Sequence, residues 1–286
     1  MSLVIALIDQ GRIHVCADLR VVKSDILTVD RRRHSPDYFN GVLKIIPISS
    51  SVAICYAGTV PIALDVIRAA KDSGCATNVI PDLVIDKLRE SNNIEECDFL
   101  VVDAAELVIQ KIQNGKVTTL DNGRTWIGDI DAYNLFQLKL NESGYSEDEN
   151  PIAKSAKIMN SLQSVINDKS INNVGEFPIT ARSSNGKIQL GVAFSAQGPS
   201  RPSGPRLNPV QFSTNTNDDS LIINLTVPVE RGIAAVGIYI TQARRGALYM
   251  PLIQDAPYLV DGNTIGEFRK KVLNDYDTEL LGGGFE

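Results

Sequence analysis

Short apolar runs joined by turn signals alternate with pairs of helical segments, and this order constrains the fold more than any other feature of the sequence. Apolar, β-branched runs that are separated by residues such as Asn-Gly predict antiparallel hairpins. The predicted strands are residues 3–8, 13–17, 42–48, 51–57, 98–103, 106–113, 116–120, 125–127, 177–183 and 187–195. We expect residues 125–127 to continue the sheet that residues 98–120 begin.

Apolar residues recur at helical spacing in two places, each between groups of predicted strands. Two helices are predicted between residues 62 and 88, and two more over residues 132–140 and 153–167. Strands that are grouped and separated by helix pairs indicate the α+β class. Two sheets, each covered by one helix pair, would bury all of these apolar faces, so we expect a four-layer αββα sandwich.

The composition changes at residues 199–209, which are rich in Pro, Gly, Ser and Arg. Such a segment is typical of a linker or a long loop. Beyond it, three β-like runs at residues 220–229, 234–242 and 247–253 precede a helix from residue 264 to about residue 280. We therefore expect a sandwich domain over residues 2–198 and a β-rich extension that ends in a helix over residues 210–286.

The composition excludes several classes of function. With 43% hydrophobic and 22% charged residues, the 286-residue chain is typical of a folded globular protein. Its 28 basic and 34 acidic residues give a net charge of -6, so we expect no nucleic-acid partner. The apolar run at residues 232–240 is less than half of the ~20 residues that span a bilayer, so we expect no membrane association and a cytoplasmic location.

The cysteines predict no disulfide framework, because no CxxC pair occurs among them. Each lies in or beside an apolar segment, which is typical of buried, reduced thiols: Cys16, Cys55, Cys75 and Cys97. His14, near Cys16 in a predicted strand, is expected to have a structural role.

Ser2 is the first candidate catalytic residue, because a methionine that precedes a small residue is generally removable. Its removal would leave one residue that bears both a hydroxyl and a free α-amine. An α-amine has an ordinary pKa of about 7.7–8.0, so it can accept the hydroxyl proton near neutral pH. Such a residue contains its own nucleophile and base, and no histidine is required.

Asp18, Lys44 and Gly58 could complete such a site. A lysine close to the amine would keep the amine neutral by like-charge repulsion, and an aspartate would keep the lysine charged and oriented. A glycine at a strand end can offer its N–H to a tetrahedral oxyanion. Each residue alone also has an ordinary interpretation, as a turn aspartate, a solvated lysine or a strand-to-helix turn.

Together these residues resemble the proteasome β-subunit and HslV-type peptidase family of N-terminal nucleophile hydrolases. The family's Ala-Asp-x-Arg motif is matched by Ala17-Asp18-Leu19-Arg20, and its Lys-[Ile/Val]-x-x-[Ile/Leu] motif by residues 44–48. Ala57-Gly58 closes the hairpin at the family's interval of fourteen residues from Lys44. Trp126-Ile127-Gly128 falls at the family's Gly-Ser-Gly turn, and Asn173-Val174-Gly175 resembles its last active-site loop.

The resemblance covers about residues 2–196 and implies that the protein hydrolyses the amide bonds of peptides or other small amides. By the family's pattern, Ser2 is the nucleophile and amine base, Lys44 its activator, Asp18 the partner of Lys44, and Gly58 the oxyanion donor. The resemblance also implies a homo-oligomeric ring and no cofactor or metal. The implied supporting residues are Arg20, Gly128, Asp129, Ser170 and Asn173.

Departures from the family pattern leave two other interpretations open. Asp129 stands where the family has a hydroxyl, and an added carboxylate would raise the pKa of the amine, so that less of it is neutral and able to act as a base. Ser170, or a shifted Asp168, stands where the family has an aspartate. In the second interpretation, these departures make the chain a catalytically inactive, proteasome-like subunit that acts as an assembly or binding module. In a third interpretation, Asp129 and Asp131 bind a hard cation in a metal-dependent hydrolase.

Overall fold

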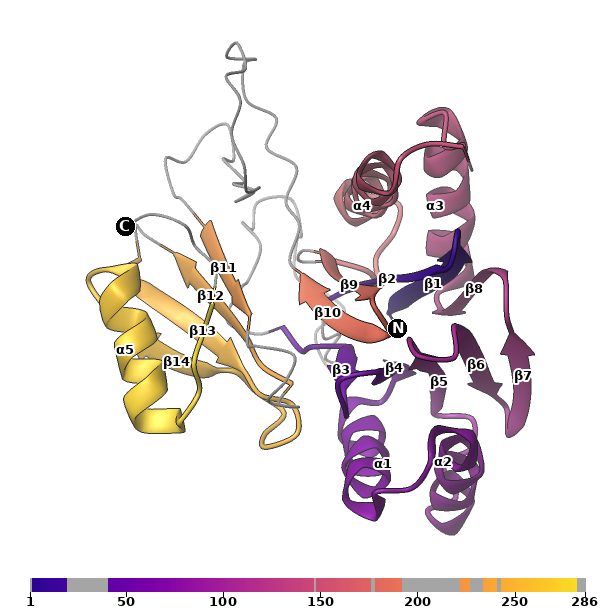
Figure 1. Ribbon diagram of the computed structural model, residues 1–286, viewed down its shortest axis with the longest axis horizontal. Coiled ribbons are helices and arrows are strands. Elements are labelled where there is room, and N and C mark those ends of the chain that lie inside the picture. Colours follow the sequence, from indigo (N-terminus) through magenta and orange to yellow (C-terminus); the bar gives the residue numbers. More distant parts are fainter. Residues whose placement is uncertain are drawn as a thin grey trace.

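The computed structural model describes residues 2–19, 41–146, 148–175, 178–191, 222–226, 234–240 and 243–281. Within these ranges it contains three antiparallel sheets and five α-helices (Figure 1), which confirms the predicted α+β class. Arg20 and the predicted linker at residues 199–209 lie outside the described residues.

Two five-stranded sheets form the centre of the fold, with strand orders β10-β9-β2-β1-β8 in the first sheet and β3-β4-β5-β6-β7 in the second. The strands of the first sheet are β1 (Leu3–Asp9), β2 (Arg12–Asp18), β8 (Gly123–Gly128), β9 (Pro178–Ser184) and β10 (Lys187–Gly191). Those of the second are β3 (Ile45–Pro47), β4 (Val52–Gly58), β5 (Cys97–Asp103), β6 (Val108–Gln113) and β7 (Lys116–Leu120).

The expectation that residues 125–127 continue the sheet of residues 98–120 is wrong. These residues belong to β8, which leaves the second sheet and pairs with β1 of the first, from Leu3 opposite Gly128 to Ile8 opposite Gly123. Gly123 has φ +80°, a left-handed conformation that lets the chain turn out of the second sheet after β7. β8 then buries Ile127 between the two sheets.

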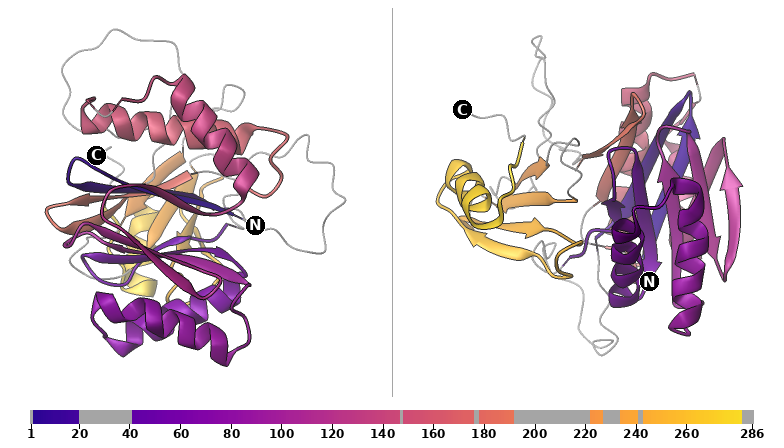
Figure 2. Two further views of the ribbon diagram at one scale, coloured as in Figure 1. Left: turned by 90° about the vertical axis from the view of Figure 1, so that its right-hand side faces the viewer. Right: turned by 60° about the horizontal axis from the view of Figure 1, so that its bottom comes forward.

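The helices cover the outer faces of the two sheets. Helices α1 (Val60–Ser73) and α2 (Ile80–Glu90) pack on the second sheet, and α3 (Ile130–Glu142) and α4 (Pro151–Asn167) pack on the first. A third apolar cluster fills the space between the sheets. Figure 2 shows the resulting order of helix pair, sheet, sheet and helix pair.

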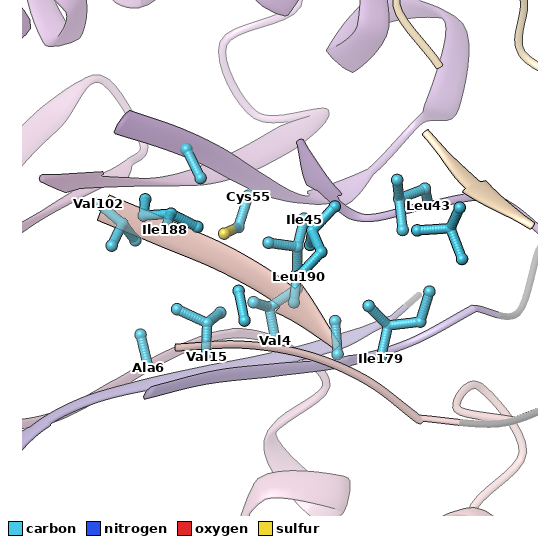
Figure 3. Packing of buried hydrophobic residues seen from close by; sticks show 14 of the residues in the cluster. Val4, Ala6, Val15, Leu43, Ile45, Cys55, Val102, Ile179, Ile188 and Leu190 are labelled. Atoms are coloured by element: carbon cyan, nitrogen blue, oxygen red, sulfur yellow. The ribbon is translucent and has the colours of Figure 1, made fainter. Parts of the chain in front are cut away.

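Strand β1 explains why the sequence begins with a continuous apolar run rather than an alternating one. Leu3, Ile5 and Leu7 face α3 and α4, whereas Val4 and Ala6 face the second sheet. Both faces of the strand are therefore buried, and each large apolar side chain contributes about 1.5–3 kcal/mol by leaving water. Figure 3 shows Val4 and Ala6 among the side chains that meet between the sheets.

A third, C-terminal sheet has the strand order β11-β12-β13-β14. Its elements are β11 (Ile222–Thr226), β12 (Val236–Ile240), β13 (Arg245–Tyr249), β14 (Tyr258–Asp261) and helix α5 (Ile265–Tyr276). The sequence did not predict β14, whose four residues form too short a pattern. The helix also ends before the predicted residue 280, because Asp277 adopts a left-handed conformation at its C-cap.

Strands β12 and β13 of the C-terminal sheet are buried on both of their faces. One face packs on α5 through residues such as Tyr239, Leu248 and Phe268. The other face contributes Ile238 and Tyr249 to the same apolar cluster that fills the space between the two central sheets. The C-terminal strands therefore share a core with the sandwich.

Candidate active site

Ser2, Asp18 and Lys44 lie together at the end of the first sheet where β1 begins and β2 ends. One Asp18 carboxylate oxygen accepts a hydrogen bond from the Leu3 N–H (2.9 Å). The other oxygen lies 2.8 Å from the Lys44 ammonium nitrogen. Asp18 therefore connects the peptide bond that follows Ser2 directly to Lys44.

This group of polar residues is buried. Asp18 is 0% exposed, Lys44 1% and Ser2 4%. A buried charge needs an oppositely charged or hydrogen-bonding partner, and here the Asp18 carboxylate and the Lys44 ammonium group are partners of each other. The Gly175 N–H also donates to the Asp18 carboxylate (3.3 Å). The sequence predicted the Asp18–Lys44 partnership but carried no signal for the two backbone amides, because every residue type except proline provides one.

Lys44 is held in place by the hairpin that follows it. Its carbonyl oxygen accepts a hydrogen bond from the Tyr56 N–H (3.2 Å), which extends the pairing of β3 and β4 beyond Ile45. The hairpin closes at Gly58, at the end of β4. The same pair of strands therefore positions both Lys44 and Gly58.

Gly58 and Gly128 end neighbouring strands of the two sheets where no side chain fits. Gly128 has φ +102°, and a Cβ atom on it would lie 1.9 Å from the Ser2 carbonyl oxygen and 3.2 Å from the Ala57 methyl carbon. Gly58 has φ +133°, and its Cβ atom would lie 2.1 Å from the Glu96 carbonyl oxygen. Both positions therefore require glycine, and the ends of β4 and β8 meet beside Ser2.

Asp129 connects Ser2 to helix α3. Its N–H donates to the Ser2 carbonyl oxygen (2.8 Å). Its carboxylate is the N-cap of α3, because one oxygen accepts from the N–H groups of Asp131 and Ala132 (both 3.0 Å). The other oxygen accepts from the Asn173 side-chain amide (2.8 Å). The negative charge of Asp129 thus faces the positive end of the helix dipole and a hydrogen-bond donor.

The segment at residues 173–175 joins the two acidic residues of the site, since Asn173 binds Asp129 and Gly175 binds Asp18. Ser170 is placed differently. It is exposed, and both its hydroxyl and its N–H donate to Asp168, at 2.6 and 2.8 Å. The hydroxyl bond holds the pKa of Asp168 below its ordinary value. The structure therefore places Ser170 and Asp168 in a surface turn after α4 and brings Asn173 to the site.

Cys97 lies opposite Gly58 in the second sheet and is close to the proposed oxyanion donor. Its thiol donates to the Thr59 carbonyl oxygen (3.4 Å). Burial raises the pKa of the Cys97 thiol to about 12, so this thiol stays protonated at neutral pH. A protonated thiol is a poor nucleophile, which leaves Ser2 as the candidate nucleophile at this end of the sandwich.

The described residues contain neither a metal-ligand cluster nor a membrane-spanning helix. In the part of the chain that the structure describes, three or more His, Cys, Asp or Glu side chains nowhere gather as metal ligands would. Among those same residues, no helix is both long and apolar enough to cross a membrane. Asp129 itself is engaged with α3 and Asn173, and this capping role accounts for its carboxylate.

Comparisons with known proteins identify similar structures only. No family model and no curated protein matches the chain. Solved structures do match, and one of them is eukaryotic HslV from Trypanosoma brucei, at 12% sequence identity and a TM-score of 0.47. The alignment covers 64% of this chain and 99% of the HslV chain. The chemistry of the site therefore has to follow from its own residues and their contacts.

Proposed function

We propose that the chain is an N-terminal nucleophile hydrolase of the proteasome-like type, which cleaves amide bonds in peptides or small amides with Ser2 as its nucleophile. One observation carries this proposal: the buried Asp18 carboxylate binds both the peptide after Ser2 and the Lys44 ammonium group. Burying an ion pair costs desolvation free energy, and buried ionisable groups of this kind are concentrated at functional sites.

Removal of Met1 supplies the base of the proposed mechanism, the α-amine of Ser2. The Ser2 hydroxyl oxygen attacks the carbonyl carbon of the amide, and its proton passes to the α-amine. The positive charge of Lys44 stabilises the negative charge that develops on the attacking oxygen, and the Gly58 N–H stabilises the oxyanion. The amine then gives the proton to the leaving nitrogen as the C–N bond breaks. Water hydrolyses the resulting ester of Ser2 and releases the carboxylic acid.

The role of Asp129 also supports an active site rather than a catalytically inactive one. A free carboxylate beside the amine would raise the pKa of that amine and keep more of it protonated, so that less could act as a base. Here both carboxylate oxygens accept hydrogen bonds, from the first turn of α3 and from Asn173. These donors and the helix dipole offset much of the effect that the negative charge of Asp129 would have at Ser2.

The experiment that tests the proposal is a mass measurement on protein expressed from its natural start codon. The intact mass and the N-terminal sequence are expected to show that Met1 is absent. A β-lactone probe is then expected to acylate Ser2 in the wild-type protein and in Ser2→Thr, but not in Ser2→Ala. Retention of Met1, or an adduct on any other residue, would contradict the proposal.

A ring-shaped homo-oligomer is part of the same proposal, since the resemblance in the sequence implies one. Native mass spectrometry would show a single defined multiple of the 31.1 kDa chain. A monomer at micromolar concentration would argue against the ring and leave the chemistry at Ser2 to be decided by the acylation experiment.

A further inference from the structure

The C-terminal sheet touches the chain close to the candidate site. Tyr249, the last residue of β13, is 2% exposed and belongs to the same apolar cluster as Leu19 and Leu43. A methyl group on Gly41 would lie 3.4 Å from the Tyr249 hydroxyl oxygen and 3.2 Å from two atoms of Leu19. Tyr249, Gly41 and Leu19 therefore pack tightly at one point, which we call the Tyr249 junction.

The Tyr249 junction lies directly beside the ion pair of the site. Leu19 follows Asp18 in the chain, and Gly41 precedes Lys44 by three positions. The Val42 N–H donates to the Leu19 carbonyl oxygen (2.9 Å), so the two chain segments are joined at this place. The position of Lys44 relative to Asp18 thus depends on how these segments are packed.

A second contact joins the C-terminal part of the chain to helix α1. Helix α1 begins two residues after Gly58, and its Arg68 side chain donates to the Pro251 carbonyl oxygen (2.9 Å). The same guanidinium group forms an ion pair with Asp255 (2.8 Å). Residues 249–255 therefore contact the segments that follow Asp18, precede Lys44 and follow Gly58 in the chain.

We propose that Tyr249 is a positioning residue, through which the C-terminal sheet holds Asp18 and Lys44 in the geometry that activates Ser2. This inference rests on the proposed function, and it makes the C-terminal extension part of the catalytic unit. Tyrosine suits the position because its large, rigid ring fills the space beside Leu19 and Gly41. A smaller side chain would leave a cavity into which the segment that precedes Lys44 relaxes.

Hydrogen exchange tests the junction without requiring activity. The informative amides are those of Leu3, which donates to Asp18, and Val42, which donates to Leu19. In Tyr249→Ala, both are expected to exchange at least about ten-fold faster than in the wild-type protein, because local opening becomes easier.

Tyr239→Ala is the matched control. Tyr239 lies on the neighbouring strand β12, is 1% exposed, and faces α5 rather than the sandwich. Its hydroxyl donates to the Gly262 carbonyl oxygen (2.8 Å). This variant removes an equally buried ring from the same sheet, and it is expected to leave exchange at Leu3 and Val42 unchanged. Equal acceleration in the two variants, or none in Tyr249→Ala, would overturn the proposal.

Acylation of Ser2 by the β-lactone supplies the second readout. Tyr249→Ala is expected to slow acylation at least about ten-fold and to change its pH profile, because the charge of Lys44 is no longer fixed beside the amine. Tyr249→Phe, which keeps the ring, is expected to restore most of the rate. A rate loss that Tyr239→Ala reproduces with an unchanged pH profile would show a purely structural role.

Two further outcomes keep the inference separate from the proposed function. If Tyr249→Ala does not fold, Gly41→Ala tests the same junction from the other side, since its methyl group would press on Leu19 and Tyr249. It is expected to accelerate exchange at Val42, and an unchanged rate would count against the junction. If the wild-type protein is not acylated, the proposed function fails by itself, and the exchange rates still decide whether Tyr249 fixes Asp18 and Lys44.

Discussion

Asp18 and Lys44 form an ion pair with a separation of 2.8 Å from which water is excluded. Removing one partner of such a pair leaves a buried charge without compensation, which costs about 3–5 kcal/mol. We therefore expect Lys44→Met to lower the free energy of unfolding by that amount. We also expect it to slow acylation of Ser2 by a β-lactone about 100-fold or more, because the developing negative charge loses its stabilising cation.

Lys154→Met is the matched control for this prediction. Lys154 is also 1% exposed, and it pairs with Asp9 at the opposite end of β1 from Ser2. Its loss should destabilise the protein to a similar extent, as measured by urea unfolding. The acylation rate should stay within about two-fold of the wild-type value, because no charge near Ser2 changes. Equal rate losses in both variants would mean that Lys44 acts only through stability.

Gly128 is expected to tolerate no side chain. In Gly128→Ala, the new methyl group would lie 1.9 Å from the Ser2 carbonyl oxygen, so β8 or Ser2 must move. We expect a loss of stability of about 4 kcal/mol or more and no measurable acylation. Gly123→Ala is the control, because Gly123 also has a positive φ but has open space around it. It should cost about 1–2 kcal/mol and leave acylation intact. Melting temperatures and adduct masses would check both variants.

Local patterns in the sequence predicted the elements that surround the site. The hairpin of β1 and β2 follows from its turn and its apolar runs, and the apolar runs at residues 42–48 and 51–57 likewise predicted the hairpin of β3 and β4. The exchange of β8 between sheets was not predictable in this way. It depends on which strand edge offers more burial to Ile127, and no local pattern encodes that choice.

The partners of the site residues were less predictable than the residues themselves. The sequence predicted that Asp18 and Lys44 are partners. It also assigned a supporting role to Ser170, which the structure places in a surface turn. Asn173, to which the sequence assigned the same role, does lie at the site, because Gly175 places that segment beside Asp18. The contact of Tyr249 with Gly41 joins residues more than two hundred positions apart, and neither residue carries a local signal for it.

The thiols are expected to differ sharply in reactivity. Burial raises the pKa of Cys16 and Cys97 to about 12 and the pKa of Cys55 still further. All four thiols are free, as the sequence predicted, but Cys75 is only partly buried, where the sequence predicted a buried thiol. Iodoacetamide at pH 7.5 should therefore modify Cys75 in the folded protein and all four cysteines in urea. Rapid modification of Cys97 in the folded protein would show that the strand end beside Gly58 opens readily.

His14 is expected to make stability depend on pH. Burial lowers the pKa of His14 below its ordinary value of 6.5, although Asp9 acts in the opposite direction, and the other charges that face it are those of Arg12, Arg182 and Lys154. The unfolded chain therefore takes up a proton before the folded protein does. Stability should fall as the pH decreases below about 6.5, by at most about 1.4 kcal/mol per pH unit from this residue.

Urea unfolding at several pH values between 7.5 and 5 would measure this effect in the wild-type protein and in His14→Gln. Glutamine can keep a hydrogen bond to Ser155, whose hydroxyl lies 3.3 Å from Nδ1 of His14, but it does not titrate. The difference in unfolding free energy between the two proteins should change across this range. A constant difference would show that His14 takes up its proton equally easily in both states.

Substitutions of Asp129 distinguish an active site from an inactive one. Its carboxylate accepts hydrogen bonds from the first turn of α3 and from Asn173, so its charge should have little effect on the amine of Ser2. Asp129→Ser removes the charge but keeps an N-cap hydroxyl, and we expect it to be acylated within about three-fold of the wild-type rate. Asp129→Ala also removes the cap, which should cost about 1 kcal/mol in urea unfolding. If Asp129→Ser were acylated and the wild-type protein were not, the carboxylate would be what inactivates the site, and the wild-type chain would be an assembly or binding module.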